Sequence, residues 1–425
     1  MSLIEDLQWR GMLQDIMPGT AEQLLKEPTF GYIGFDPSAE SLHIGSLVPI
    51  LLLMHLQKAG HHPIALVGGA TGMVGDPSGK SEERNLLDAD TLYKNIKGIK
   101  KQLEQFLDFD PSRENPALVV NNYDWFGQIT FLDFIRDTGK HITVNYMMAK
   151  DSVKKRLEGS AGMSFTEFTY QLVQGYDFYW LYSHMNCKLQ MGGSDQWGNI
   201  TTGAELIRRK TGGEAFAFTC PLITKADGGK FGKTEKGNVW LDADKTTPFQ
   251  FYQFWLNASD VDTAKWIKIF TFLNKQEIAE LLENHFVRPE ERGLQKALAK
   301  EITTLVHGEH EWKKATEQTD KLFANLAAPA ESLTEADLLS LDGIVRSPFS
   351  ADRIKQGINV ISLLAESGIF SSKGEARKMV QNGGISINRS KVENQTMVVN
   401  SELLLHGKFI LVQRGKKNYY LVEAV

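Results

Sequence analysis

A short segment near the N-terminus, residues 43–46, combines residue types that bind phosphate. It reads His-Ile-Gly-Ser and stands where an expected strand passes into an expected helix. His43 and Ser46 can donate hydrogen bonds to phosphate oxygens, and Gly45 would let a nucleotide approach a helix N-terminus, which attracts anions. An ordinary surface turn can have the same four residues, so the segment is informative only together with others.

Two lysine-containing loops supply further candidate phosphate ligands. Residues 230–234 read Lys-Phe-Gly-Lys-Thr and follow Asp-Gly-Gly, which predicts a mobile glycine-rich loop that could close on a pyrophosphate. Residues 78–84 form a second charged loop. For each loop, a solvated basic turn is the alternative interpretation. The expected ligands in the two loops are Lys80, Arg84, Lys230, Lys233 and Thr234.

Together these segments predict a reaction at the α-phosphate of ATP. A carboxylate that attacks this phosphorus is already ionised, so the barrier comes from charge on the five-coordinate phosphorus and on the leaving pyrophosphate. Positioned cations and donors lower that barrier. The sequence has no matching Ser-His-Asp or paired-carboxylate arrangement. We expect ATP as a substrate, with Mg²⁺ arriving together with it, and neither a protein metal site nor a tightly bound cofactor.

A long aromatic helix with one polar face predicts a pocket for a small polar ligand. The helix is expected over residues 164–185, and Tyr170, Gln174 and Asp177 are spaced so that they share one face. Exposure of this face to solvent is the alternative.

A glycine-rich connection between a strand and a helix lies nearby in the sequence. Residues 192–199 read Gly-Gly-Ser-Asp-Gln-Trp-Gly-Asn. The glycines permit close approach of a ligand, and Asp195 could accept hydrogen bonds from ribose hydroxyls. A tight structural turn is the alternative.

These residues require a parallel α/β sheet to bring them together. Short apolar runs ended by Gly, Pro or Asp predict strands, and a helix is expected to start close to Gly45, because Pro49 is tolerated only in a first turn. Parallel sheets of this kind bind ligands at the carboxyl ends of their strands. The expected strands are residues 30–35, 63–67, 117–121 and 188–191.

The rest of the chain is expected to form further domains. A helical insertion rich in Phe, Ile and Met interrupts the catalytic domain, and its spare apolar surface predicts a subunit interface. The expected domains are a catalytic domain over residues 1–225 with its insertion at about 124–160, a signature loop and helical domain over 226–327, a linker over 328–350, and a compact module over 351–425.

Length and composition indicate a multidomain globular protein. The 425 residues are too many for one core, and 42% hydrophobic with 23% charged residues is typical of globular proteins. The N-terminus lacks a signal-peptide pattern, and no apolar run is long enough to span a bilayer. The two cysteines form no CxxC pair, so we expect a reducing, cytoplasmic location.

The charge distribution indicates a nucleic-acid partner at one end of the chain. The net charge is −5, but residues 351–425 contain 11 Lys+Arg and 6 Asp+Glu and so carry +5, whereas the rest carries −10. A basic module on an acidic enzyme fits contact with RNA. Ordinary compositional scatter explains the charge equally well.

In their order along the chain, these segments resemble one family, the bacterial type of tyrosyl-tRNA synthetase, a class I aminoacyl-tRNA synthetase. The resemblance covers essentially the whole chain. It implies an α/β fold, with a Rossmann-like parallel-sheet catalytic domain and helical insertion, then an α-helical domain and a small α+β S4-type RNA-binding domain. The matching segments are residues 31–37, 43–46, 72–80, the helix around Tyr170, residues 192–199 and residues 230–234.

The resemblance implies a role for each site residue. Tyr32 and Asp177 would bind the phenol hydroxyl of tyrosine, and phenylalanine would leave both unpaired, which is costly for buried groups; tyrosine-specific synthetases are themselves the established example of this discrimination, and no editing domain is needed. The tyrosine ammonium would be held by Tyr170, Asp76 and Gln174, with Asn121 nearby. The adenylate and tyrosine sites would be lined by Gly34, Asp36, Gly193, Asp195 and Gln196, and the ATP site would also include His43, Gly45 and Lys233. The phosphates would be bound by His43, Ser46, Lys80, Arg84, Lys230, Lys233 and Thr234.

The resemblance also implies partners and one departure. Ser46 stands where the family's first signature commonly ends in a second histidine, and its shorter hydroxyl would reach one oxygen less well. Lys373, Arg377 and Lys378 fall on one short helix of the S4-like module, suited to an RNA backbone. The partners implied are tRNA(Tyr), L-tyrosine, ATP and a second copy of the chain, without a membrane.

Three alternative functions remain open from the sequence. A tryptophan-specific synthetase would share both signatures, although Tyr32 and Asp177 favour tyrosine. A nucleotidylyltransferase also uses a histidine-glycine signature but needs neither the amino-acid pocket nor the RNA module. An RNA-binding paralogue with an inactive catalytic domain would not need the retained His43 and lysines.

Overall fold

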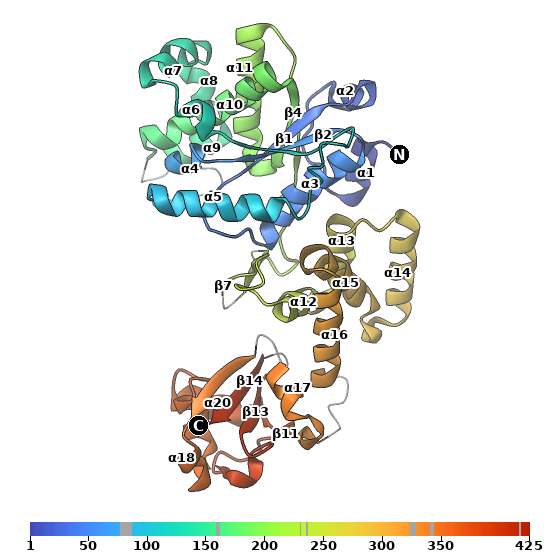
Figure 1. Cartoon of the computed structure of the whole chain (residues 1–425), viewed down its shortest axis with the longest axis vertical. Coiled ribbons are helices and arrows are strands. Elements are labelled where there is room, and N and C mark those ends of the chain that lie inside the picture. The colour runs from blue at the N-terminus through green and yellow to red at the C-terminus, as the bar shows by residue number, and fades with distance from the viewer. Residues whose placement is uncertain are drawn as a thin grey trace. The chain divides into compact units, whose positions relative to one another are not determined.

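The structure, a computed structural model of the whole chain, describes residues 1–76, 87–158, 162–229, 231–234, 237–323, 329–340, 344–415 and 418–425. The chain divides into two compact units, Met1–Lys245 with Trp255–Val306 and Thr246–Phe254 with His307–Val425. Within the described residues, each unit is built around one five-stranded sheet (Figure 1).

The sheet of the first unit is entirely parallel, in the order β3-β2-β1-β4-β5. From β1 the chain adds β2 and β3 on one side and then β4 and β5 on the other, so the order of strand addition reverses between β1 and β4. In parallel sheets, ligands bind beyond the carboxyl ends of the strands at such a point. The four expected strands are confirmed, whereas β5 was not expected. The strands are β1 (Phe30–Phe35), β2 (His62–Val67), β3 (Leu118–Asn121), β4 (Cys187–Gly193) and β5 (Phe216–Cys220).

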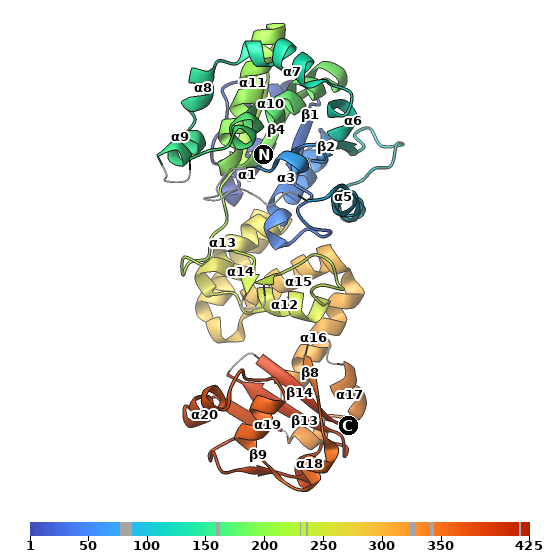
Figure 2. The ribbon, with the colours of Figure 1, turned by 90° about the vertical axis from the view of Figure 1, so that its left-hand side faces the viewer.

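Helices cover both faces of this sheet, as the apolar runs of β1 and β2 require. Helices α3 (Leu47–Lys58) and α5 (Ala89–Leu103) lie on one face, and α10 (Phe165–Met185) and α11 (Trp197–Thr211) on the other (Figures 1 and 2). The strand β1 shows this alternation, because Tyr32 packs on Phe178 of α10 while Gly31 faces Leu56 of α3. The smaller helices of the sheet region are α1 (Leu3–Arg10), α2 (Thr20–Lys26) and α4 (Thr71–Val74).

Local signals in the sequence fix the ends of the two helices nearest the expected site. Ser164 caps the N-terminus of α10, and its partner Glu167 completes a capping box. Asn186, in the left-handed region at φ 52°, ends the same helix. Pro49 lies in the first turn of α3, as expected.

Helices also form the insertion and the region after the sheet, as expected. The insertion contains α6 (Tyr123–Phe126), α7 (Phe131–Asp137), α8 (Val144–Met148) and α9 (Asp151–Leu157). A short hairpin, β6 (Lys233–Thr234) with β7 (Gly237–Asn238), precedes the later helices. These are α12 (Pro248–Leu256), α13 (Asp260–Phe270), α14 (Lys275–Val287), α15 (Gly293–His307) and α16 (Glu309–Phe323).

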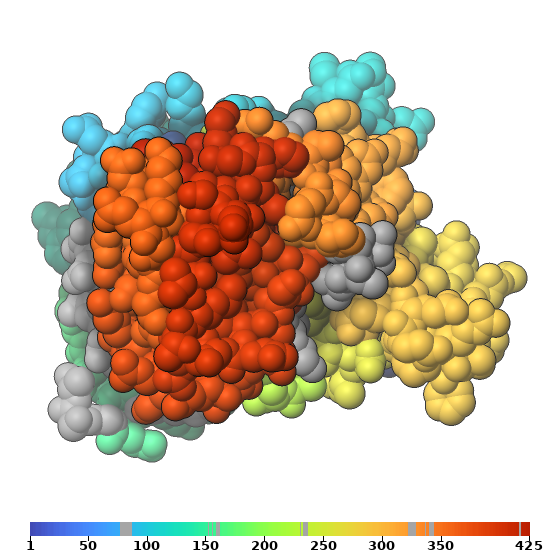
Figure 3. Space-filling model, turned by 90° about the horizontal axis from the view of Figure 1, so that it is seen from below, coloured from blue at the N-terminus to red at the C-terminus, as the bar shows by residue number. Residues whose placement is uncertain are grey.

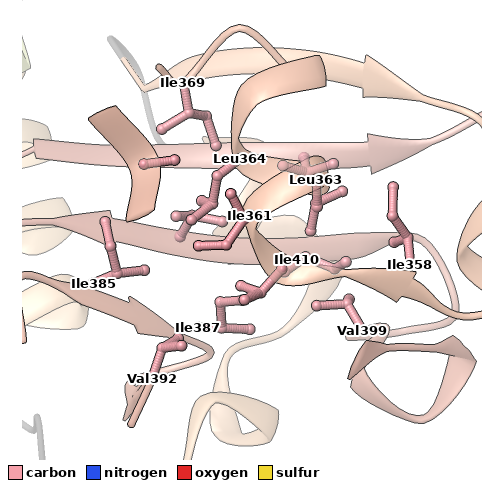
Figure 4. Close-up of a cluster of buried hydrophobic side chains, with 14 of the residues drawn as sticks. Ile358, Ile361, Leu363, Leu364, Ile369, Ile385, Ile387, Val392, Val399 and Ile410 are labelled. Carbon is pink, nitrogen blue, oxygen red and sulfur yellow. The ribbon is translucent and has the colours of Figure 1, made fainter. Parts of the chain in front are cut away.

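The C-terminal part of the second unit packs helices on a mixed sheet of order β11-β10-β13-β14-β8. Its core contains Ile361 and Leu364 of α19, which face Ile387 and Ile410 of the sheet (Figure 4). Residues of this part form one continuous surface, coloured orange to red in Figure 3. The elements are β8 (Val345–Phe349), α18 (Ala351–Lys355), β9 (Ile358–Asn359), α19 (Val360–Glu366), α20 (Lys373–Gln381), β10 (Ile385–Ile387), β11 (Ser390–Lys391), β12 (Val398–Val399), β13 (Phe409–Arg414) and β14 (Asn418–Ala424).

The interpretation of residues 328–350 as a linker needs correction. Helix α17 (Glu335–Ser340) lies within this range, and β8 pairs in parallel with β14 as an edge strand of the C-terminal sheet. The Pro and Ser residues that suggested a linker are compatible with an edge strand, because one side of such a strand needs no ladder hydrogen bonds. The sheet of the C-terminal part therefore starts before residue 351.

No helix among the described residues is long and apolar enough to cross a membrane. Cys187 and Cys220 are both buried and are free thiols.

Candidate active site

A cavity of about 210 Å³ lies at the carboxyl ends of β1 and β4, where the strand order reverses. Its walls come from β1, the start of α3, the loop after β2, α10 and β4. A larger, open hollow beside α5 and β3 contains none of the expected ligands. The expected site residues that line the cavity are Tyr32, Gly34, Asp36, Asp76, Tyr170, Gln174, Asp177, Gly193 and Gln196.

The polar face of α10 is buried against this cavity and does not face solvent. Tyr170 is 4% exposed and Asp177 is 1% exposed, and Gln174 is half-buried. Buried polar side chains need hydrogen-bond partners, and these three side chains form part of the cavity wall, where a ligand could supply such partners. The structure therefore favours the ligand-binding interpretation of this stripe over the solvent-exposed one.

Asp177 and Tyr32 both line the cavity and offer a ligand one acceptor and one donor. Burial raises the pKa of Asp177 to about 7, and two hydrogen bonds to its carboxylate oppose this shift. The Tyr32 hydroxyl is fully buried and has no hydrogen-bond partner in the described part of the chain. Burial and the nearby Asp177 charge raise the pKa of Tyr32, so the phenol remains a donor. An unsatisfied buried hydroxyl costs about 1–3 kcal/mol, which a ligand hydroxyl would relieve.

Two residues that the sequence did not single out hold the Asp177 carboxylate. Asn122 donates to Asp177 Oδ2 at 3.0 Å, and the indole of Trp125 donates to Oδ1 at 2.9 Å. Asn122 is fully buried and also donates to Thr71 Oγ1 at 3.0 Å. Asn121, the expected residue, does not line the cavity, and its Oδ1 accepts from the backbone N–H of Tyr123 at 3.0 Å.

A second polar network connects the loop after β2 with α10 and the start of α11. Gln196 donates to Asp76 Oδ2 at 2.8 Å and, at 3.3 Å, to Asp195 Oδ2. Asn199, which was not expected, donates to Gln174 Oε1 at 2.9 Å. Burial raises the pKa of Asp195, and the charge of Asp76 adds to this effect. The network joins two carboxylates and three amides beside the cavity, and their oxygens are acceptors suited to a cationic ligand group.

The first signature forms a compact turn in front of α3. The Nδ1 atom of His43 accepts from the backbone N–H of Gly45 at 2.9 Å, so the neutral ring carries its proton on Nε2. A Cβ atom at Gly45 would lie 2.6 Å from His43 Cε1. Glycine is therefore required here by the histidine ring itself, a reason that the sequence did not reveal. Ser46 is half-buried directly before α3, and its side chain makes no capping hydrogen bond.

The second signature lies beside the first. The backbone N–H of Ile44 donates to Val239 O at 2.9 Å, and the N–H of Val239 donates to Gly232 O at 3.1 Å. Phe231 packs on the rings of Trp266 and Phe270, with ring centroids 5.0 and 5.3 Å apart. Phe231 and Gly232 are thus anchored next to the His-Ile-Gly-Ser turn.

Several expected phosphate ligands lie outside the described residues. Lys80, Arg84 and Lys230 belong to this group, as do the side chains of Lys233 and Thr234. Lys373, Arg377 and Lys378 are described, and all three are exposed on α20, whose opposite face buries Ala376 and Val380. Lys373 also lies 3.4 Å from Glu366.

Comparison with known families places this site in one class. Residues 25–324 match the family described as tRNA synthetases class I (W and Y). Residues 347–422 match the tyrosine–tRNA ligase SYY-like C-terminal domain. The chain belongs to the class I tRNA synthetases of the tryptophan and tyrosine group.

Within this group, end-to-end relatives identify the branch. The chain is 58% identical over 431 residues to the tyrosine–tRNA ligase of Bacteroides thetaiotaomicron and 59% identical over 429 residues to that of Parabacteroides distasonis, with all of each chain covered. The chain is therefore a member of the tyrosine–tRNA ligase family.

Solved structures agree with this assignment. A C-terminally truncated mitochondrial tyrosyl-tRNA synthetase of Aspergillus nidulans superposes with a TM-score of 0.69 at 30% identity, covering 76% of this chain and 94% of that chain. The tryptophanyl-tRNA synthetase of Encephalitozoon cuniculi shares the fold, with a TM-score of 0.52 at 13% identity, covering 79% of this chain and 89% of that chain.

Proposed function

We propose that the chain activates L-tyrosine with ATP to tyrosyl-adenylate and pyrophosphate, and then transfers tyrosine to the 3′ end of tRNA(Tyr). The observation that carries the proposal is the unsatisfied Tyr32 hydroxyl beside the Asp177 carboxylate in one buried site. A phenol ligand would donate to Asp177 and accept from Tyr32. The alternatives of a tryptophan-specific synthetase and a nucleotidylyltransferase are not favoured, because indole offers no hydroxyl and a bare nucleotide would not need this pair.

The rest of the cavity suits the amino-acid head group and the adenylate. The ammonium would be held by Tyr170, Asp76 and Gln174. The amide of Gln196 donates to Asp76, and the amide of Asn199 donates to Gln174. The adenylate would lie against the glycine-rich ends of β1 and β4, where a nucleotide can approach the backbone. The residues proposed for the adenylate are Gly34, Asp36, His43, Gly45, Gly193, Asp195, Gln196 and Lys233.

The phosphate chemistry would need no general base. The tyrosine carboxylate attacks the α-phosphorus as the bond to the bridging oxygen of pyrophosphate breaks, and the developing charge is stabilised by donors. His43, with its proton on Nε2, and Ser46 are the described donors proposed for this role. Lys80, Arg84, Lys230, Lys233 and Thr234 are proposed to complete the set, and Mg²⁺ to arrive bound to ATP.

The remaining partners are proposals from surface chemistry. Lys373, Arg377 and Lys378 on α20 would contact the tRNA backbone, in a module of S4 type. A homodimer is proposed through the insertion and the start of α10, which expose large apolar side chains. These are Phe131, Leu132, Ile135, Val144, Met148 and Phe165. The free thiols of Cys187 and Cys220 support a reducing, cytoplasmic location.

The decisive experiment is amino-acid-dependent exchange of labelled pyrophosphate into ATP. We expect exchange with tyrosine and none above background with tryptophan or phenylalanine. Exchange with tryptophan alone would overturn the substrate assignment, and no exchange with any amino acid would support an inactive RNA-binding protein. Sedimentation of the same sample tests the homodimer, and a monomer at micromolar concentration would contradict it.

A further inference from the structure

Three aromatic rings are stacked directly behind Asp177. The indoles of Trp125 and Trp180 lie 4.2 Å apart between ring centroids at an angle of 12°, and the Trp180 and His184 rings lie 4.5 Å apart at 13°. Asp177, Trp180 and His184 share one face of α10, because Trp180 follows Asp177 by three residues and His184 follows it by seven. Trp125 comes from α6 in the insertion. The stack therefore joins the insertion to the face of α10 that carries Asp177.

The indole of Trp125 is held by α10 at two points. Its N–H donates to Asp177 Oδ1 at 2.9 Å, and its face rests on Trp180. A hydrogen bond alone leaves an indole free to tilt about the donor, whereas a second contact on the ring face removes that freedom. Trp180 in turn is covered by His184, whose Nδ1 lies 2.9 Å from the Trp180 carbonyl oxygen. Trp180 is not among the residues that line the cavity.

We propose that Trp180 is a positioning residue for recognition of the substrate hydroxyl, acting through Trp125. By fixing the plane of the Trp125 indole, Trp180 keeps the N–H aimed at Oδ1 of Asp177, so that the carboxylate presents a defined lone pair to the ligand. This inference rests on the proposed function and extends it to a residue that does not touch the substrate. It predicts that the discrimination of tyrosine from phenylalanine depends on a stacked ring outside the pocket.

The test is a set of variants of the full-length chain in the pyrophosphate exchange assay. Trp180→Leu keeps an apolar side chain but loses the ring face, and we expect the KM for tyrosine to rise roughly threefold to tenfold. The KM for ATP should stay unchanged, and the ratio of the exchange activity with tyrosine to that with phenylalanine should fall. Trp180→Phe retains a ring face and should restore most of the tyrosine KM. His184→Leu, at the exposed end of the stack, serves as the matched control and should have little effect.

A double-mutant cycle separates positioning from general packing. Trp125→Phe keeps the ring but removes the N–H donor, and we expect it to raise the tyrosine KM at least as much as Trp180→Leu. If Trp180 acts through Trp125, the double variant should resemble Trp125→Phe alone, because the two effects are not independent. Melting temperatures of all variants identify any that are unfolded at the assay temperature; if Trp180→Leu is one of them, Trp180→Met and Trp180→Phe provide the same comparison.

Three results would overturn this inference while leaving the proposed function intact. They are an unchanged tyrosine KM in folded Trp180→Leu, an equal rise of the KM for ATP, and additive effects in the double variant. Absence of tyrosine-dependent exchange in the unsubstituted chain would instead overturn the proposed function, and this inference with it.

Discussion

Gly232 lies directly against Ile44, so that a Cβ atom at position 232 would approach Ile44 Cγ1 to 3.1 Å. The same atom would lie 3.7 Å from the backbone nitrogen of Gly45. Gly232 also has a φ of 80°, in the region that favours glycine. The two signatures, nearly two hundred residues apart in the sequence, therefore lie so close together that position 232 has little room for a side chain.

Gly232→Ala should slow adenylate formation more than it affects tyrosine binding. The new methyl group meets Ile44 and the residue is strained at positive φ, which together displace the loop relative to His43. We expect kcat for pyrophosphate exchange to fall about tenfold, with little change in the tyrosine KM. Gly228→Ala is the matched control, since Gly228 has the same φ of 80° but nothing within 4 Å of its added Cβ. Equal effects of the two substitutions would show that contact with Ile44 does not matter.

Asn122→Ala should impair tyrosine recognition, whereas Asn121→Ala should not. The first change removes a donor to Asp177 and leaves part of a buried carboxylate unsatisfied, which costs about 1–3 kcal/mol. The second removes only a side chain that accepts from the Tyr123 backbone outside the cavity. Steady-state exchange at varied tyrosine compares the two directly. A larger rise in tyrosine KM for the Asn121 variant would contradict the proposed arrangement.

Tyrosine binding should strengthen as the pH rises through about 7. Burial raises the pKa of Asp177 to about 7, and its ionised carboxylate accepts a hydrogen bond from the ligand phenol more strongly than the neutral acid does. The tyrosine KM should therefore fall between pH 6 and 8, while Asp177→Asn should show weak binding without this dependence. The free energy of unfolding responds in the opposite direction. The pKa of Asp177 is higher in the folded than in the unfolded chain, so between about pH 4 and 7 the native state binds a proton that the unfolded state has lost. The stability that this proton contributes is lost as the pH rises through 7. A flat KM profile in the unsubstituted chain would refute the assignment.

The His55→Leu variant should lose less stability than the parent chain when the pH falls below about 6.5. Burial, and then the charge of Arg10, lower the pKa of His55 to about 4. Its neutral form contributes stability that is fully present above about pH 6.5 and is lost as the pH falls towards 4, a difference of about 3 kcal/mol. When the pH is lowered from 7 to 5, the denaturant concentration at the unfolding midpoint should fall less for the leucine variant than for the parent chain. The same loss of stability on acidification in both proteins would assign the effect to other groups.

A truncation that ends at residue 323 should retain tyrosine-dependent exchange but charge tRNA poorly. It removes α17, β8 and the exposed cations of α20 together. A chain that ends at Ser350 makes a useful contrast, because it keeps β8 without β14, its pairing partner in the C-terminal sheet, and exposes Phe349. We expect that chain to aggregate in size-exclusion chromatography. Undiminished charging at limiting tRNA by the shorter variant would refute the RNA role of the C-terminal part.

Strong local patterns made the central elements predictable. The strand β1 has the expected bounds because an apolar run ends at Asp-Pro, and α10 starts where Ser164 and Glu167 form a capping box. β8 was missed because Pro348 and its polar neighbours resemble a linker, and an edge strand tolerates both. β5 was missed although all of its residues are buried. Elements whose identity depends on pairing with distant strands carry little local signal.

The grouping of side chains around the cavity was predictable where residue type decides it, and not where side-chain direction decides it. Tyr32, Asp76, Gln174 and Asp177 line one cavity, as expected. Asn121 and Asn122 are chemically identical neighbours, and only the direction of the backbone after β3 determines which amide reaches Asp177. The donation from Trp125 to Asp177 likewise follows from tertiary packing, for which no spacing in the sequence is diagnostic.

The pairing of β8 with β14 has a consequence for the order in which the chain can fold during synthesis. All five strands of the first unit's sheet have been synthesised once the ribosome reaches Cys220, with about half of the chain still to be made. β8 (Val345–Phe349) is synthesised well before β14 (Asn418–Ala424), the strand with which it pairs. The C-terminal sheet therefore cannot be completed until β14 has been made, whereas the sheet of the first unit needs no strand after Cys220. In a growing chain, the cavity of the proposed active site could therefore form before the part of the chain proposed to bind RNA.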